Sequence, residues 1–455
     1  MQSSPCPAAA LADRWCRVLS RRGDEVALWE WGNGGTRPQS WSFVRLDEEA
    51  EQRARALRGG AGDRRAPVVV AATGSVADFV IGVLAAWKAG RAAALEEAGT
   101  GVPLPALPWP ETMPVALVKR TSGSTGAPRH LLFNADQVVA DVDQLLPTMA
   151  LDPEWINLAA VSPAHSYGFS NLVTPLLFHG MRLLAPGSVL PQAVRRSQHW
   201  LEAEAGSTAS LVIPAVPAMW RAWLDSAAVA PDGVARAISA GAMLPTALEQ
   251  AALGAWGLKI HNFYGSSECG GIAYDDSDQV RPEPGRVGRP VAGVCLSIDD
   301  TGRVVVHSRA CALGVWSDDG FDEQSVVGQG RFVSTDLGRL GGDGVLCLGG
   351  RADDVVNLAG RKVNPESVEA ILRAHDLVEH CVVFGIESGD AARGEELVAC
   401  VRLRGVATAD GVRRWLAGRL PAWQQPRHWW VCDDLRPDVR GKIPRAVWRR
   451  RFGAR

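Results

Sequence analysis

Residues 121–129 read Thr-Ser-Gly-Ser-Thr-Gly-Ala-Pro-Arg. Four hydroxyl side chains, two glycines and one cation within nine residues predict a flexible loop that is rich in backbone N–H and hydroxyl donors. Such a loop can wrap the oxygens of a phosphate group, with Arg129 neutralising part of their charge. The same composition also suits a hydrophilic hairpin turn, so this stretch alone leaves both interpretations open.

Around this loop, short apolar runs with β-branched residues alternate with longer Ala- and Leu-rich segments at helical spacing. This alternation predicts an α/β fold, with mostly parallel sheets covered by helices. A proline-rich connection over residues 103–114 separates the first strand–helix unit from the rest. The predicted strand–helix pairs are 68–70 with 78–88, 211–213 with 218–224, and 237–239 with 245–255.

The last third of the chain has a different texture. After about Pro282 the apolar runs are short and separated by Gly and Asp turns, which predicts an antiparallel β-rich subdomain. From about Gly350 the pattern predicts a small α+β unit of its own. Its predicted elements are a helix at 365–374, strands at 381–384 and 397–403, and a helix at 411–420.

The chain length of 455 residues favours two or three domains. We predict a large N-terminal domain over residues 1–350 and a small C-terminal domain over residues 351–455. A hydrophobic fraction of 47% and a net charge of −2 exclude a disordered polyelectrolyte and disfavour nucleic-acid binding by the whole chain.

Charge is unevenly distributed along the chain. Residues 401–455 carry 14 basic and 4 acidic side chains, a net charge of +10. This basic end suits an acidic partner or a phosphorylated ligand, or it is a solvated tail around residues 449–451. Only five of the 48 basic residues are lysine, so a lysine in a chemical motif is informative.

The nine cysteines are scattered without a C-x-x-C pair, which disfavours a zinc ribbon, a redox dithiol and a disulfide framework. The N-terminus lacks a signal pattern, and the most apolar stretch, residues 68–86, contains Asp78. We therefore expect a reduced, cytoplasmic protein without a membrane span. Walker A, Rossmann and serine-hydrolase motifs are also missing from the sequence.

Three further segments carry chemistry. In Asn-Phe-Tyr-Gly-Ser-Ser-Glu (262–268), the tyrosine offers a stacking face for a base and Glu268 a ligand for Mg²⁺; a surface turn with a core tyrosine is the alternative. Asp336 and Arg351 suit either ribose hydroxyls or a structural ion pair. The glycine turn at 440–445 presents Lys442, which is otherwise an ordinary tail lysine.

In this order, the four motifs resemble those of the adenylate-forming superfamily: acyl- and aryl-CoA synthetases, nonribosomal adenylation domains and firefly luciferase. The resemblance covers nearly the whole chain. It implies that the protein activates a carboxylic acid with ATP and Mg²⁺ to an acyl-adenylate. It also implies that the acyl group then passes to the thiol of a phosphopantetheine arm.

The resemblance assigns a nucleotide-binding role to sixteen residues, with Arg129 standing where the family usually has a closing lysine. Ser267 matches the α-phosphate contact, Glu268 the Mg²⁺ carboxylate, and Asp336 and Arg351 the ribose pair. Thr335 replaces a family glycine, which puts the tightness of that turn in doubt. The sixteen are Thr121, Ser122, Gly123, Ser124, Thr125, Gly126, Gly241, Ala242, Met243, Asn262, Phe263, Tyr264, Gly265, Ser267, Asp336 and Arg351.

In the small, mobile domain, Asp353 matches the hinge, Gly360 the loop that lines the thiol tunnel, and Lys442 the lysine that enters the site for adenylation. Asn357 stands where the family often has lysine. With Glu268, His165 and Arg129, Lys442 completes the predicted catalytic set.

The acid pocket is the third implied site. His165 matches a position common in acyl- and aryl-CoA ligases, although a histidine here also suits an ordinary core position. The aromatic residues and the small Gly270 and Gly271 favour a flat acid, such as a hydroxybenzoate, over a long alkyl chain. The predicted lining is His165, Tyr167, Gly168, Phe169, Pro214, Gly270 and Gly271.

The short chain looks most like stand-alone ligases of aryl-polyene and xanthomonadin-type pigment clusters, which load aromatic acids onto acyl carrier proteins. No carrier domain follows in this sequence, so we expect a separate acidic carrier protein as the partner. The alternatives are an aryl- or fatty-acyl-CoA synthetase that uses coenzyme A, and a nucleotide-binding homologue that has lost its chemistry.

Overall fold

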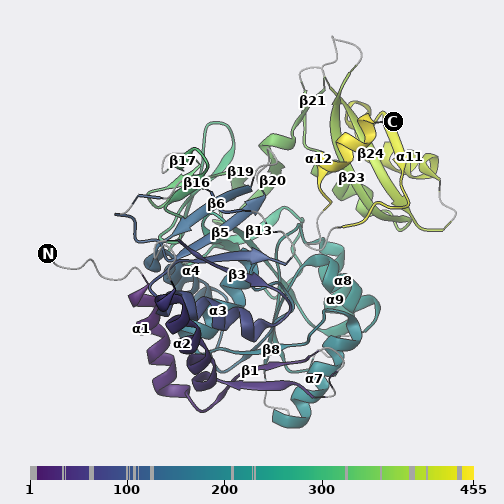
Figure 1. The fold of residues 1–455 in the computed structure, drawn as a ribbon. Helices are drawn as coiled ribbons and strands as arrows, with labels where there is room; N and C mark the ends of the chain where they lie inside the picture. Colours follow the sequence, from purple (N-terminus) through teal and green to yellow (C-terminus); the bar gives the residue numbers. More distant parts are fainter. Residues whose placement is uncertain are drawn as a thin grey trace.

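The structure is a computed structural model. It describes residues 8–32, 35, 37–60, 66–98, 101, 103–105, 109–110, 112–122, 128–205, 210–227, 229, 232–322, 326–358, 361–388, 395–405, 408–437 and 443–454. Figure 1 shows a large N-terminal part and a smaller C-terminal part coloured from green to yellow. The predicted α/β class with two unequal parts is confirmed.

The largest sheet has a parallel half, in which the neighbouring strands run in the order β11, β10, β9, β7, β8 and β1. Helices α7 (Pro191–Ala205), α8 (Pro217–Asp225) and α9 (Thr246–Trp256) connect successive strands. The predicted strand–helix pairs after residue 210 are therefore confirmed. The strands are β1 (Val26–Glu30), β7 (Ile156–Leu158), β8 (Arg182–Ala185), β9 (Leu211–Ala215), β10 (Val234–Ser239) and β11 (Ile260–Ser266).

The second sheet holds the loop with which the sequence analysis began. Its order is β17, β16, β6, β5, β4 and β3, with β3, β4 and β5 parallel and the remaining pairs antiparallel. Helix α3 (Val76–Lys88) follows β3, as predicted. The strands are β3 (Val68–Ala72), β4 (Ala93–Glu97), β5 (Leu117–Ser122), β6 (Pro128–Phe133), β16 (Gly314–Ser317) and β17 (Gly320–Asp322).

Helix α4 (Ala135–Thr148) contributes to the main core of buried side chains. It begins with a capping box, in which the Asn134 side chain accepts from the Gln137 backbone N–H and the Gln137 side chain accepts from the Asn134 N–H. The N-terminal helices α1 (Ala9–Arg22) and α2 (Phe43–Gly59) bury their apolar faces in the same core. Strand β2 (Gln39–Ser42) pairs with β1 at the sheet edge.

The predicted antiparallel texture after Pro282 is confirmed, since the main sheet continues past β11 through antiparallel strands. Strands β19 and β20 pair so that Asp336 lies directly opposite Arg351. These strands are β12 (Gly270–Tyr274), β13 (Arg286–Pro290), β14 (Cys295–Ile298), β15 (Arg303–His307), β18 (Val327–Gly328), β19 (Arg331–Leu340) and β20 (Leu346–Arg351).

After β20 and a 3-10 turn at Ala352–Asp354, the described part of the chain builds two small cores from residues 356–452. The predicted helices and strands of this part are present, and the exact domain boundary remains a prediction. Its elements are β21 (Val356–Leu358), β22 (Arg361–Val363), α10 (Pro365–Arg373), β23 (Val378–Glu387), β24 (Glu395–Leu403), α11 (Ala409–Ala417), β25 (His428–Val431) and α12 (Arg445–Gly453).

The C-terminal segment is a helix rather than a solvated tail. In α12, Trp448 is buried in the last core and Phe452 packs against it, while Arg449, Arg450 and Arg451 are exposed. The guanidinium of Arg451 also lies 4.2 Å from the centroid of the Trp448 ring. Within the described ranges, no helix is both long and apolar enough to cross a membrane.

A buried ionic network joins α9 to β11. Glu249 is fully buried and accepts from Lys259 Nζ at 3.2 Å and from Arg281 Nε at 2.7 Å. Lys259 also donates to Asp275 at 2.7 Å, and Arg281 donates to the Leu244 carbonyl oxygen at 2.7 Å. Because buried charges are costly unless paired, these contacts fix α9 and the loop before it, at Leu244, relative to the start of β11.

We expect Glu249→Ala to lower the free energy of unfolding by about 3–5 kcal/mol, because it leaves the buried Arg281 without its carboxylate partner. Denaturant unfolding measures this loss. The matched control is Glu283→Ala, which breaks the exposed pair with Arg339 and is expected to cost about 1 kcal/mol or less. Equal losses for both variants would contradict the prediction.

Candidate active site

The residues singled out from the sequence gather where the parallel strands β7, β9, β10 and β11 end. In open α/β sheets, ligands bind outside the carboxyl ends of the strands. Here the segments that follow β7, β10 and β11 hold His165, Gly241 and Ser267, and Pro214 lies near the end of β9. The predicted acid and nucleotide segments therefore lie along one edge of one sheet.

Tyr264, Asp336 and Arg351 come together from three strands. The Tyr264 hydroxyl donates to Asp336 Oδ2 at 2.5 Å, and Arg351 Nε lies 4.0 Å from Asp336 Oδ1. Thr335 lies in β19 with an ordinary backbone conformation, and its hydroxyl accepts from Arg351 at 2.7 Å. The doubt about a tight turn is thus resolved, because threonine fits the strand and orients the arginine.

The turn after β10 is exposed, and β10 pairs in parallel with β11, the strand that carries Tyr264. Gly241 has a φ of 83°, a conformation that favours glycine, and Ala242 next to it is exposed. Asn262 is buried, and its side-chain N–H donates to the Val287 carbonyl oxygen at 3.2 Å. Phe263 points the other way into the main core, so it supports the site from behind.

The loop at 121–129 connects two antiparallel strands, β5 and β6, with Thr121 opposite Arg129. The hairpin geometry and the phosphate-binding prediction are therefore compatible. Gly123, Ser124, Thr125 and Gly126 lie outside the described residues, as does the side chain of Ser122.

A hydroxyl pair joins the acid-pocket segment to the phosphate segment: Ser166 Oγ donates to Ser267 Oγ at 2.8 Å. Next to it, the Glu268 side chain accepts from the Ser266 hydroxyl, and the Glu268 carbonyl oxygen accepts from the Ala312 N–H at 2.8 Å. The chain thus holds the Glu268 backbone firmly while its carboxylate remains partly exposed.

Residues 165–169, which are predicted to line the acid pocket, form a compact helical turn. His165 is partly exposed and caps a short helical turn, with Nδ1 accepting from the Tyr167 N–H. The Tyr167 hydroxyl donates to the Ile238 carbonyl oxygen at 3.3 Å, and Phe169 is buried. Gly168 is required for close packing, because a Cβ there would lie 2.0 Å from the Ser162 carbonyl oxygen.

The space beside Gly270 and Gly271 is already filled by protein. A Cβ on Gly270 would lie 2.1 Å from Asp141 Oδ1, and one on Gly271 would lie 2.6 Å from Leu145. Both neighbours belong to α4, so packing explains the two glycines without reference to the shape of the acid. Pro214, the remaining predicted lining residue, is buried in β9 opposite Ile238.

At the junction with the small part, the Asp353 side chain is 50% exposed and lies 3.9 Å from Arg351. Asn357 donates its backbone N–H to Glu395 at 2.7 Å. Gly360 and Lys442 lie outside the described residues, but Arg445, three residues after Lys442, donates to Asp354 at 2.6 Å and to Glu369 at 2.8 Å.

Comparison with known proteins decides the family. Residues 93–312 match the model of the AMP-binding enzyme family, and residues 367–442 match that of the AMP-binding enzyme C-terminal domain. A probable 2-succinylbenzoate–CoA ligase of Mycobacterium tuberculosis is 30% identical over 354 residues, covering 74% of this chain and 85% of that protein. The chain belongs to the AMP-binding enzyme family.

A second relative is also an acid–CoA ligase. Sulfoacetate–CoA ligase of Cupriavidus necator is 26% identical over 396 residues, covering 79% of this chain and 76% of that protein. The fold is shared with ATP-bound MatB from Rhodopseudomonas palustris (TM-score 0.80, 20% identity, 97% and 99% of the two chains). It is also shared with the anthranilate CoA ligase AuaEII in complex with anthranoyl-AMP (TM-score 0.78, 21% identity, 98% of each chain).

As a member of this adenylate-forming family, the AMP-binding enzyme is an AMP-forming acid–thiol ligase that activates a carboxylic acid with ATP. No cluster of three or more metal-binding side chains occurs in the described part of the chain. The single carboxylate of Glu268 fits Mg²⁺ held mainly by phosphate oxygens and water, the usual coordination of this ion.

Sequence reasoning missed two buried residues of this AMP-binding enzyme, Lys119 in β5 and Asp141 in α4. A signal for Lys119 was present, because a charged residue interrupts the apolar run that begins at Val115. Asp141 had none, since an acid on a helix ordinarily faces solvent. Ser166, which bonds to Ser267, was also overlooked as a site residue.

All three tyrosines of the enzyme should resist ionisation. Burial raises the pKa of Tyr167, Tyr264 and Tyr274, and the Asp336 carboxylate raises that of Tyr264 further. We expect no tyrosinate absorbance in the folded enzyme as the pH passes about 10, the ordinary tyrosine pKa. The guanidinium-unfolded chain is the control and should titrate near pH 10.

The sign for stability follows from the same shifts. A raised folded-state pKa means that the contribution of the three phenols is fully present below about pH 10 and is lost above it. Denaturant unfolding should therefore show falling stability above about pH 10. A tyrosine that titrates normally in the folded enzyme would contradict the buried positions.

Proposed function

We propose that the enzyme converts an aromatic carboxylic acid and ATP to an acyl-adenylate, and then transfers the acyl group to a phosphopantetheine thiol. The 2.8 Å bond between Ser166 and Ser267 carries this proposal. It holds the segment predicted to bind the acid against the segment predicted to bind the α-phosphate. Adenylation requires this juxtaposition, because the acid carboxylate must attack the α-phosphorus.

The main barrier to this step is the mutual repulsion of two anions. His165 would orient the acid carboxylate, while Arg129 and Lys442 would neutralise charge on the phosphates and on the attacking oxygen. Mg²⁺ held by Glu268 would supply further charge neutralisation. Tyr264 would stack on adenine, with Asp336 and Arg351 at the ribose hydroxyls, so that the α-phosphorus is held in line.

For transfer to the thiol, we propose that the small C-terminal domain turns about Asp353. The separate cores of residues 356–452 support a unit that moves as one body, and the exposure of Asp353 leaves it free to change conformation. The turn would withdraw Lys442 and bring the Gly360 loop to the acyl-adenylate.

The relatives favour coenzyme A as the acceptor, because the similar proteins of Mycobacterium tuberculosis and Cupriavidus necator are CoA ligases. Succinylbenzoate and anthranilate, named for two of the similar proteins, support an aromatic acid. An acidic acyl carrier protein is the second candidate acceptor, favoured by the net charge of +10 over residues 401–455. Free thiols at all eight described cysteines suit a reduced, cytoplasmic setting.

Lys442→Ala should reduce the rate of ATP–pyrophosphate exchange by a factor of roughly 100 or more, because it removes a charge contact to the transition state. It should spare thiol transfer from a supplied acyl-adenylate. Lys88→Ala, which removes a partly buried lysine paired with Asp47, is the control. Equal loss of both half-reactions in the Lys442 variant would refute the proposed role.

The acid and the acceptor are tested together. Pyrophosphate exchange over a panel of aromatic and aliphatic acids should be strongest with a benzoate-type acid. Coenzyme A and an acidic holo-carrier protein, offered in parallel, should differ by at least about tenfold in kcat/KM, with coenzyme A preferred. If none of the acids supports pyrophosphate exchange, the result would favour a homologue that has lost its chemistry. A preference for the carrier protein would select the second candidate acceptor.

A further inference from the structure

Behind the predicted acid pocket, Asp141 crosslinks two segments of the site. Its Oδ2 accepts from Ser170 Oγ at 2.5 Å, and its Oδ1 accepts from the Gly271 backbone N–H at 3.0 Å. Ser170 lies five residues after His165, and Gly271 lies three residues after Glu268. One carboxylate therefore holds the back of the acid-binding segment against the back of the phosphate-binding segment.

The same two segments are also joined at the front by the bond between Ser166 and Ser267. The two crosslinks are four residues apart on each chain segment. Together they prevent one segment from sliding along the other, which a single hydrogen bond does not do. Asp141 is 6% exposed, so its bonds do not compete with bulk water.

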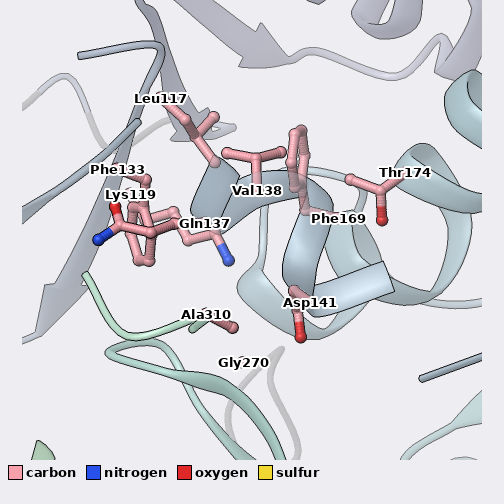
Figure 2. Close-up of a pocket in the computed structure, with 10 residues that line it drawn as sticks. All are labelled: Leu117, Lys119, Phe133, Gln137, Val138, Asp141, Phe169, Thr174, Gly270 and Ala310. Carbon is pink, nitrogen blue, oxygen red and sulfur yellow. The ribbon is translucent and has the colours of Figure 1, made fainter. Parts of the chain in front are cut away.

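The Asp141 charge is buried together with a lysine. Lys119 lines the same cavity, of about 10 Å³, which is room for one water molecule (Figure 2). Its Nζ lies 4.8 Å from the ring centroid of Phe133 and 5.8 Å from that of Phe169. Burial lowers the pKa of Lys119, and the Asp141 charge opposes that shift.

We propose that Asp141 is a positioning residue for the acid substrate, and that Lys119 is its buried counter-charge. The pair acts through Ser170 and Gly271, which set the spacing between His165 and Glu268. This inference rests on the proposed function, because it concerns the acid pocket of that reaction.

The first test is Asp141→Asn, which keeps the shape but offers only one acceptor oxygen to two donors and removes the charge. We expect KM for the acid to rise roughly tenfold or more, the size of losing a hydrogen bond to a charged group, while KM for ATP changes by less than about twofold. Asp143→Asn on the same helix is the matched control, because that exposed carboxylate bonds to Arg14 and His179 instead. It should leave both KM values unchanged.

Charge pairing is tested by Lys119→Met, alone and combined with Asp141→Asn. Removing one buried charge is worse than removing both, so the double variant should lose less than the sum of the single losses. Additive losses would overturn the counter-charge role of Lys119.

Amide hydrogen exchange gives a readout that does not depend on the acid. In Asp141→Asn, exchange should become faster over residues 162–173 and 266–274, and it should stay unchanged in Asp143→Asn. If Asp141→Asn does not fold, Ser170→Ala removes one of the two bonds and should show a smaller effect in the same segments. If amide hydrogen exchange is unchanged in the folded Asp141→Asn variant, the inference is overturned. This holds even where the wild-type enzyme catalyses pyrophosphate exchange.

The two proposals fail in different ways. Suppose that amide hydrogen exchange is faster in the Asp141→Asn variant but the wild-type enzyme activates no acid. That result would contradict the proposed function, and with it the substrate role of Asp141. An equal rise of both KM values would also overturn a positioning role that is specific for the acid.

Discussion

The parallel pairing of β7, β9, β10 and β11 is the constraint on which the rest of the site depends. Because these strands run in one direction, their carboxyl ends meet at one edge, and each following loop can carry one chemical group to the same place. The antiparallel strands β19 and β20 then bring Asp336 and Arg351 to Tyr264 of β11. The site is thus assembled from loops whose positions are fixed by a rigid sheet.

Polar links between loops then set the distances that the sheet leaves free. The Glu249 network holds α9 and the loop before it relative to the start of β11, and Asp141 holds the segment after His165 against the segment after Glu268. Apolar packing alone would tolerate small shifts of these loops, whereas a buried carboxylate loses much of its stabilisation when one donor moves away. Buried, hydrogen-bonded charges therefore fix the positions of the loops at the site.

Much of this was predictable from the sequence, and the limits are physical. The α/β class, the strand–helix pairs and the nucleotide motifs depend on local spacing, which a single sequence displays. The partnership of Lys119, Asp141 and Gly271 depends on three segments that only the fold brings together, and no spacing predicts it. The packing of α4 against Gly270 has the same origin, because no local pattern shows which helix lies beside that glycine.

The departures from the family pattern are better explained as exchanges of contacts than as losses of function. Thr335 replaces a glycine, yet its hydroxyl accepts a hydrogen bond from Arg351, so Arg351 gains an anchor. Arg129 keeps a positive charge at the end of the predicted phosphate loop, where the family usually has lysine. Lys119 and Asp141 are buried behind the predicted pocket, where an apolar pair would be less costly. The cost of that pair is itself an argument that the spacing it maintains is used.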